Sequence, residues 1–337
     1  MALYVNTNVT SLKGQSSLTK ATNSLSTTYQ RLSTGLRINS AKDDAAGLQI
    51  SDRLTSQING LTQGNRNAND GIALAQTIEG SMDEMTTMLQ RIRTLAVQSA
   101  NGTLTTTDRA SIQAEVTALS KEITRIASKT TYGGKTILSG FGTQTSMIRN
   151  NGTKASINFQ VGANQYDVLK LDMTLNGTAA TDTFKKNLTD YSLGSLMKAA
   201  FAGDKLESVQ KNSQAMFMTS SSTTDVANAS GNYTSYYVWN VSGSGAAQAT
   251  LGAIDKVINL IDTKRGDFGA LENRLSSTID NQTNISNNES DARSRIRDTD
   301  YAEEASNLSA QSIVQQAASS MLTQANSLPQ LALSLLG

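Results

Sequence analysis

Two pairs of adjacent carboxylates come closest to a catalytic arrangement in this sequence. They are Asp43 with Asp44, and Glu303 with Glu304. A general acid and a general base must approach one substrate from defined directions, whereas adjacent residues on a helix point about 100° apart. Each pair also lies near the start of a predicted helix, where carboxylates interact favourably with the helix dipole. We therefore predict that these residues support helix starts and that the protein is not an enzyme.

The composition excludes most other chemistry. The 337 residues include no cysteine and no histidine, and Lys+Arg 29 nearly balance Asp+Glu 28. Thiolate nucleophiles, disulfides, imidazole bases and the commonest transition-metal ligands are therefore absent. We predict no cofactor and no metal site, while a surface Ca²⁺ held only by oxygen ligands stays open. The near-zero net charge predicts no nucleic-acid partner.

The carboxyl-terminal segment has an unusual composition. From Ala305 to Gly337 it carries no charged side chain. It also contains no apolar run of the roughly 20 residues that cross a bilayer. We therefore predict burial against protein and no membrane insertion. The amino terminus lacks the basic and apolar regions of a general secretory signal peptide, so export by that route is not expected.

Heptad spacing predicts coiled-coil helices at both chain ends. The predicted seam residues are Leu18, Leu25 and Leu32 near the amino end, and Val314, Ala318, Met321, Ala325, Leu328 and Leu335 near the carboxyl end. Because alanine fills part of the seam, a lone helix would bury too little apolar area to offset roughly 1–2 kcal/mol of backbone entropy per residue. We expect these helices to become ordered on assembly. Pro329 is expected to kink or end the last helix.

The interior of the chain changes its hydrophobic period twice. Apolar heptads from about residue 50 to 99 predict a helix roughly 75 Å long, and a second helix is predicted to start near Thr106 and fold back against it. Alternating apolar residues at 157–161 and 169–175 predict a β-hairpin. The helical period returns at Leu251, and the polar residues 281–297 are expected to be helical at first and then a linker.

The predicted fold is mainly α. Both chain ends form a long antiparallel helical coiled-coil rod, and a β-hairpin and a small α+β outer domain are inserted in the middle. We assign residues 1–42 and 298–337 to terminal helices that form an inner coiled-coil core. Residues 43–175 and 245–297 form a helical rod domain with the hairpin, and residues 176–244 form a surface-exposed outer domain.

Two long sequence strings carry a family resemblance. Residues 32–48 read LSTGLRINSAKDDAAGL, and residues 90–101 read QRIRTLAVQSAN. Shorter matches are VNTN at 5–8, FQVGAN at 159–164 and LSLL at 333–336. These strings resemble the signatures of bacterial flagellins. The resemblance covers residues 1 to about 175 and about 245 to 337, and it leaves out the middle, which flagellins vary.

This resemblance implies a structural subunit that polymerises into the extracellular bacterial flagellar filament used for motility. The implied partners are other copies of the chain, the flagellar type III export apparatus, a chaperone, and the filament cap and junction proteins. The terminal helices would line a hollow tube, and the outer domain would face outward. Two alternatives stay open: a hook–filament junction protein, which has similar terminal helices, and an adhesin or immune ligand whose helices only display the outer domain.

The resemblance also implies two candidate surfaces. Arg91, Leu95 and Glu115 occupy positions that help to form the surface recognised by Toll-like receptor 5, and contact between subunits is their alternative role. Thr94 departs from the pattern, because many similar flagellins have Glu there. Similar outer domains carry O-linked sugars on exposed hydroxyls, with an undecorated loop as the alternative. The candidate acceptors are Thr219, Ser220, Ser221, Ser222, Thr223 and Thr224.

Overall fold

A computed structural model describes residues 8–139, 147, 156–173, 196, 217–220 and 236–336. The chain divides into two compact units. Unit 1 comprises Met1–Gly60 and Thr283–Gly337, and unit 2 comprises Leu61–Gln282. The first unit thus combines the two ends of the chain, and the second holds everything between them.

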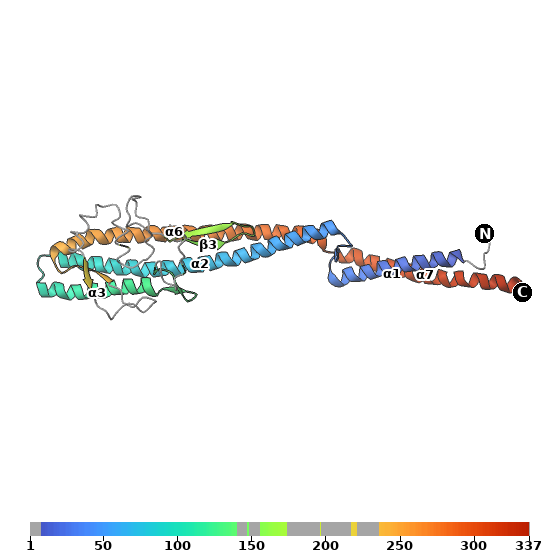
Figure 1. Ribbon diagram of the computed structural model, residues 1–337, viewed down its shortest axis with the longest axis horizontal. Coiled ribbons are helices and arrows are strands. Elements are labelled where there is room, and N and C mark those ends of the chain that lie inside the picture. Colours follow the sequence, from blue (N-terminus) through green and yellow to red (C-terminus); the bar gives the residue numbers. More distant parts are fainter. Residues whose placement is uncertain are drawn as a thin grey trace. The chain divides into compact units, whose positions relative to one another are not determined.

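Unit 1 contains the helices of both chain ends. Helix α1 spans Val9–Thr34 and helix α7 spans Tyr301–Leu336, and Figure 1 shows them side by side. The unit also holds the first residues of α2 (Ala45–Ala100) and the last residues of α6 (Ser244–Arg297). Helix α1 ends at Thr34 and is capped by Gly35, which has a φ of 71° and donates its N–H to the carbonyl oxygen of Arg31 at 2.8 Å. Glycine adopts this left-handed conformation without a Cβ clash.

Unit 2 is built around three helices. Helix α3 spans Thr106–Lys129 and lies beside the second part of α2 and the first part of α6 (Figure 1). It begins at a capping box, in which the side chains of Thr105 and Asp108 each accept the other residue's backbone N–H. The helix predicted to start near Thr106 is therefore present.

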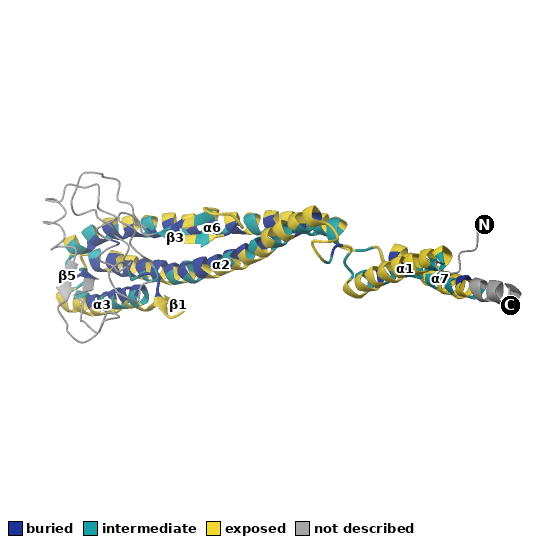
Figure 2. Ribbon diagram, turned by 45° about the vertical axis from the view of Figure 1, so that its right-hand side comes forward, coloured by how far each residue is buried: buried dark blue, intermediate teal, exposed yellow. Residues whose placement is uncertain are grey.

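The predicted heptad positions of α2 form the core of unit 2. The fully buried positions are Ala68, Ala75, Met82, Leu89 and Ala96 in one series, and Ile78, Met85, Ile92 and Ser99 in the other. All the apolar members except Ala75 share one cluster with Val116 and Ile123 of α3 and with Ile261 and Phe268 of α6. Figure 2 shows the buried residues on the sides of these helices that face one another. The heptad pattern therefore predicted the core face of α2 correctly.

Six short strands form three antiparallel hairpins in the part of the chain that the structure describes. Their pairs are β1 (Thr131–Tyr132) with β2 (Lys135–Thr136), β3 (Ser156–Gln160) with β4 (Val168–Asp172), and β5 (Phe217–Ser220) with β6 (Tyr236–Trp239). Gly133 and Gly134 have φ values of 56° and 77°, which suit the two-residue turn between β1 and β2. The mainly helical fold with a β-hairpin is confirmed. The outer domain predicted at 176–244 lies largely outside the described residues.

One local prediction is wrong, and one of the two outcomes predicted for Pro329 is excluded. Residues 281–297 do not end in a linker, because α6 continues to Arg297. Their polar side chains cost at most about 0.7 kcal/mol each in a helix relative to alanine, so low hydrophobicity alone does not end one. Helix α7 does not end at Pro329 either, since it continues to Leu336. A proline removes one backbone hydrogen bond, and the bonds on both sides of it can persist.

Candidate functional site

Helices α1 and α7 meet along a narrow seam in unit 1. The buried apolar residues are Ala21 of α1 and Ala325 of α7, with 3% and 4% of their surface exposed. Leu322 lies against the backbone of α1, because a Cβ added at Gly14 would be 3.2 Å from its Cδ1. Asn8 Nδ2 donates to the carbonyl oxygen of Ala325 at 2.7 Å. The predicted seam residues that are buried or half-buried are Leu18, Leu25, Leu32, Ala318 and Ala325.

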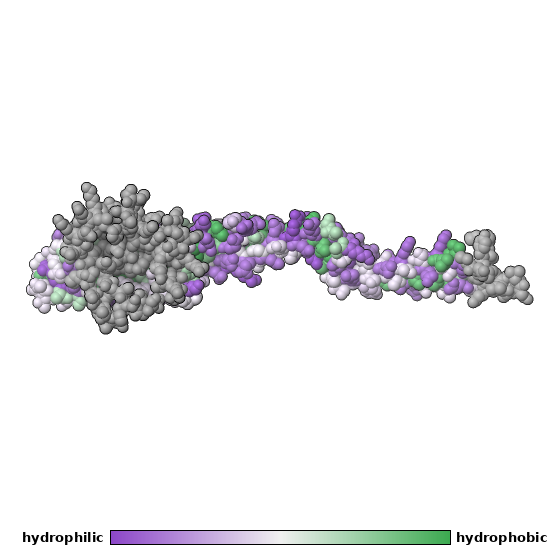
Figure 3. Space-filling view, viewed as in Figure 1, coloured by the Kyte–Doolittle hydropathy of each residue, from purple (hydrophilic) through white to green (hydrophobic). Residues whose placement is uncertain are grey.

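Two other predicted seam residues remain open to solvent in the single chain. Val314 is 48% exposed and Met321 is 65% exposed, and Ile313 beside them is 67% exposed. On α1, Val9 and Leu12 are 52% and 57% exposed. Figure 3 shows hydrophobic patches over this helix pair. The seam residues therefore divide into a group that faces inward and a group that faces solvent. Leu328 and Leu335 lie outside the residues whose side chains are described.

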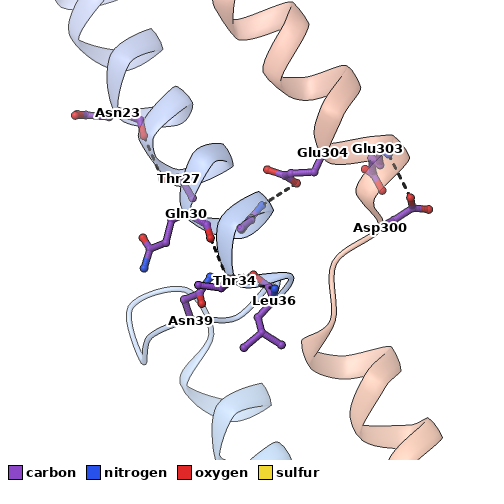
Figure 4. A network of polar contacts seen from close by, with 10 residues as sticks. Asn23, Thr27, Gln30, Thr34, Leu36, Asn39, Asp300, Glu303 and Glu304 are labelled. Carbon is purple, nitrogen blue, oxygen red and sulfur yellow. Dashed lines mark hydrogen bonds and ion pairs between the residues drawn. The ribbon is translucent and has the colours of Figure 1, made fainter.

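A polar network surrounds the point where α1 ends and α7 begins (Figure 4). Asp300 caps α7, because its Oδ1 accepts the N–H groups of Ala302 at 2.8 Å and Glu303 at 3.3 Å. The side chain of Glu304 is only 7% exposed, and its Oε2 lies 3.8 Å from Nη1 of Arg31. Glu303 and Glu304 thus have separate roles. Glu303 donates its N–H to the cap of α7, and the carboxylate of Glu304 forms an ion pair with Arg31 of α1.

Asp43 and Asp44 also have structural partners. Asp44 Oδ1 accepts the N–H groups of Ala46 and Gly47 at 3.0 and 2.9 Å, at the start of α2. Asp43 Oδ2 accepts the N–H of Ser40 at 2.9 Å, and this hydrogen bond is the main cause that lowers the pKa of Asp43. Asp44 thus supports the start of α2, as the sequence predicted, whereas Asp43 holds the loop before it.

Arg91 and Glu115 meet on the surface of unit 2. Arg91 donates from Nε and Nη2 to Oε1 of Glu115 at 2.9 and 2.7 Å, and the two side chains are 55% and 44% exposed. Thr94 is exposed beside them on α2. Leu95 is only 3% exposed and belongs to the core cluster. The structure therefore brings the two charged residues of the candidate receptor surface together and buries the third residue.

Sequence reasoning missed how the β3–β4 hairpin is held. A Cβ at Gly64 of α2 would lie 1.8 Å from the carbonyl oxygen of Val161, so the two backbones are in direct contact. Asn67 Nδ2 donates to the carbonyl oxygen of Gln160 at 2.8 Å, and Gln282 Nε2 donates to that of Val161 at 2.6 Å. A glycine inside a long helix is unfavourable by about 1 kcal/mol relative to alanine. The presence of Gly64 within α2 could therefore have indicated, from the sequence, that another backbone lies close to the helix there.

Gln113 of α3 holds the chain where it leaves β6. Its Nε2 donates to the carbonyl oxygen of Trp239 at 2.7 Å, and its Oε1 accepts the N–H of Val241 at 2.6 Å. Ser99 of α2 donates its hydroxyl to the carbonyl oxygen of Val241. The side-chain amide forms the hydrogen bonds that a neighbouring strand would form, and together with Ser99 it fixes the residues after β6 on α2 and α3.

The remaining candidates give no site within the described residues. No group of three or more acidic side chains there could hold a metal ion. No described helix combines the length and the apolar character that a membrane span requires. The hydroxyl run at 219–224 starts in β5, and its side chains lie outside the part of the structure that can be described.

Comparisons with known proteins match most of the chain. Residues 5–143 match the family model described as "Bacterial flagellin N-terminal helical region", and residues 251–336 match "Bacterial flagellin C-terminal helical region". Polar flagellin F of Vibrio parahaemolyticus is 36% identical over 377 residues, and flagellin A of Vibrio cholerae is 38% identical over 378 residues. Each alignment covers 100% of both chains. A crystal structure of Bacillus cereus flagellin aligns with a TM-score of 0.42 and 22% identity, over 64% of this chain and 88% of that one.

Proposed function

The chain belongs to the bacterial flagellin family, and we propose that it polymerises through the exposed apolar face of α1 and α7. Flagellins are the structural subunits of the extracellular flagellar filament, and this chain is one of them. The observation that carries the proposal is the exposure of Val314 and Met321 by 48% and 65%. Both lie on a helix with no charged residue after Glu304.

Burial of this face supplies the driving force for assembly. A fully buried valine or methionine side chain contributes roughly 1.5–3 kcal/mol relative to an exposed one. Among the described apolar residues of α1 and α7, only Ala21 and Ala325 are buried within the single chain. Such a small seam supports ordering of the terminal helices when an arriving subunit packs them against earlier subunits.

Seeded growth tests the proposal. Full-length protein is dissociated by heat, mixed with filament fragments and imaged by electron microscopy, beside a variant truncated after Asn307. Long filaments from the full chain and none from the truncated chain are expected, because the truncation removes Val314 and Met321. Equal growth of the truncated chain would show that the charge-free segment is not the polymerising surface.

Two further results separate this function from its alternatives. A hook–filament junction protein would join filaments without extended self-polymerisation, so long filaments of the pure chain speak against it. An adhesin or immune ligand would depend on its outer domain. Deletion of residues 176–244 should leave assembly intact if that domain is a displayed surface element, and loss of filaments would contradict the structural assignment.

A role as a filament subunit also implies partners other than copies of the chain. The flagellar type III export apparatus and a chaperone would handle the chain before assembly, and the filament cap and junction proteins would contact it afterwards. The charge-free stretch from Ala305 to Gly337 supports a need for a chaperone, since an exposed apolar segment without charge associates non-specifically. A complex of purified chaperone with the full chain, lost on truncation after Asn307, is the expected result.

We also propose that the surface around Arg91 and Glu115 is recognised by Toll-like receptor 5. Their exposed ion pair supports this role, whereas the buried Leu95 would act by supporting the surface. Arg91→Ala should lower receptor activation by monomer. Arg93→Ala is the matched control, because Arg93 is an equally exposed arginine of α2 that pairs with Asp255 on α6. Unchanged potency of Arg91→Ala would remove Arg91 from the proposal.

The remaining assignments are also proposals. We infer no catalytic role for the protein, supported by the structural partners of Asp43, Asp44 and Glu304. The division into an inner core (1–42 and 298–337), a rod domain (43–175 and 245–297) and an outer domain (176–244) rests on sequence periodicity. O-linked modification of the hydroxyl run at 219–224 is tested by the intact mass of native protein, and the mass of the unmodified chain would exclude it.

A further inference from the structure

Met321 of α7 is the one strongly exposed methionine among those that the structure describes, with 65% of its surface open to solvent. The others are buried or half-buried: Met82, Met85, Met88, Met147 and Met173. The chain contains no cysteine, and its single tryptophan, Trp239, is fully buried. In the described part of the chain, the thioether of Met321 is therefore the sulfur most accessible to a dissolved oxidant.

The side chain of Met321 lies away from the contact between α1 and α7. Val314, seven residues earlier and thus on the same side of α7, is also exposed, whereas Ala325 is buried and Leu322 lies against α1. No charged residue follows Glu304 on this helix. The sulfur of Met321 can therefore be modified in the free subunit without disturbing the seam that joins the two terminal helices.

Hydrogen peroxide oxidises a thioether in a balanced two-electron step. A sulfur lone pair attacks one peroxide oxygen, the O–O bond breaks and an S–O bond forms. The proton on the transferred oxygen passes to the leaving hydroxide, which departs as water, so the sulfur is oxidised and the peroxide is reduced. A thioether has no proton to lose, so access to the sulfur controls where the reaction occurs. Methionine sulfoxide reductases reverse the change.

Oxidation turns an apolar side chain into a polar one. The sulfoxide oxygen is hydrated in the free subunit, where the side chain of Met321 faces solvent. Its burial against another subunit would remove that water, and a polar group buried without a hydrogen bond is unfavourable. Oxidation should therefore leave the folded subunit intact and weaken only the contact that covers Met321.

We propose that Met321 is a site of reversible oxidation that controls whether a free subunit can join the filament. A peroxide reaches the sulfur in the free subunit, and the sulfoxide then disfavours addition to the filament end. In a subunit that has already assembled, the packing that covers the apolar face also excludes the oxidant, so existing filaments are protected. This inference rests on the proposed function and adds to it a modification site on the polymerising surface.

Peroxide treatment followed by seeded growth tests the site. The monomer is treated with hydrogen peroxide, cleared of it with catalase, analysed by peptide mass spectrometry and mixed with seeds. Oxidation should raise the critical concentration about tenfold, equivalent to about 1.4 kcal/mol, and the two methionine sulfoxide reductases should reverse the rise. Growth that stays unchanged although mass spectrometry shows the sulfoxide at Met321 would overturn the proposal.

Two variants assign the effect to one sulfur, each compared with its own untreated sample. Met321→Leu lacks the oxidisable atom, so peroxide should change its critical concentration by less than about twofold. Met88→Leu is the matched control, because it removes a half-buried methionine of α2 and keeps Met321. It should respond to peroxide like the unmodified chain. An equal response of Met321→Leu would place the effect elsewhere and refute the proposal.

Competition within one sample decides the question if Met321→Leu does not polymerise. Partly oxidised unmodified chain is mixed with seeds, the filaments are sedimented, and the sulfoxide at each methionine is measured in the pellet and the supernatant. Sulfoxide at Met321 should be depleted about tenfold in the pellet, whereas sulfoxide at Met88 should be evenly distributed. An even distribution for Met321 would refute the proposal. Failure of the untreated chain to grow filaments would instead contradict the proposed function.

Discussion

Gly64→Ala should destabilise unit 2 by forcing the β3–β4 hairpin off α2. The added Cβ would lie 1.8 Å from the carbonyl oxygen of Val161, far inside the 3.0 Å below which real Cβ contacts essentially never occur. Because the obstacle is backbone, overpacking should cost about 1–3 kcal/mol. Loss of the hydrogen bonds from Asn67 and Gln282 adds about 1–3 kcal/mol. The better helix propensity of alanine offsets about 1 kcal/mol, which leaves a net loss near 3 kcal/mol.

Two other glycines of α2 provide matched controls for the same substitution. A Cβ added at Gly80 would meet nothing within 4 Å, so Gly80→Ala should stabilise the protein by about 0.5–1 kcal/mol. Gly71→Ala would bring the Cβ to 3.2 Å from side-chain atoms of Leu275 and Phe159, which can shift. Its effect should therefore fall between those of Gly80→Ala and Gly64→Ala.

Urea unfolding of the full chain, followed by tryptophan fluorescence, measures this series. Trp239 is the single tryptophan of the chain and is fully buried in unit 2, so its signal reports on that unit. The predicted order of stability is Gly80→Ala, unmodified chain, Gly71→Ala and then Gly64→Ala. If Gly64→Ala proved as stable as Gly80→Ala, the close contact between α2 and the hairpin would be refuted.

Three further substitutions test other contacts. Burial, and secondarily the charge of Glu79, raises the pKa of Glu272. The ionised carboxylate is therefore unfavourable in the folded state, and the free energy of unfolding rises as the pH falls. Glu272→Gln should raise the urea midpoint more at pH 7 than at pH 4. Gln113→Ala should cost about 1–3 kcal/mol in the same assay, because it removes the hydrogen-bond partner of the buried N–H of Val241. Thr105→Ala should cost about 1 kcal/mol through loss of the capping box, measured by thermal unfolding.

Periodicity in the sequence was enough to predict the elements that form by burying one face. The heptads of α2 predicted residues such as Met82 and Ile92 that are fully buried, because a helix in a rod repeats one environment. The alternating residues around Phe159 likewise predicted the hairpin. The polar end of α6 was misjudged, since hydrophobic period indicates which face is buried and not where a polar helix stops.

The candidate sites were less predictable than the helices, because they depend on which side of each helix contacts which other segment. The predicted seam of α7 includes both Val314 and Ala325, but in the single chain Ala325 is buried and Leu322 lies against α1, while Val314 stays exposed. The burial of Leu95 could not be read from its spacing to Arg91. Contacts between distant segments, such as Gln282 with Val161, leave no periodic signal at all.

The proposed function requires that exposed apolar residues of α7 drive polymerisation. The most direct test is the critical concentration for seeded growth of a Val314→Ser/Met321→Ser variant beside the unmodified chain, with far-UV circular dichroism of both monomers as the control. The two side chains lie outside the seam with α1, so the monomer spectra should match. The variant should grow no filaments at concentrations where the unmodified chain grows long ones. Filaments with an unchanged critical concentration would contradict it.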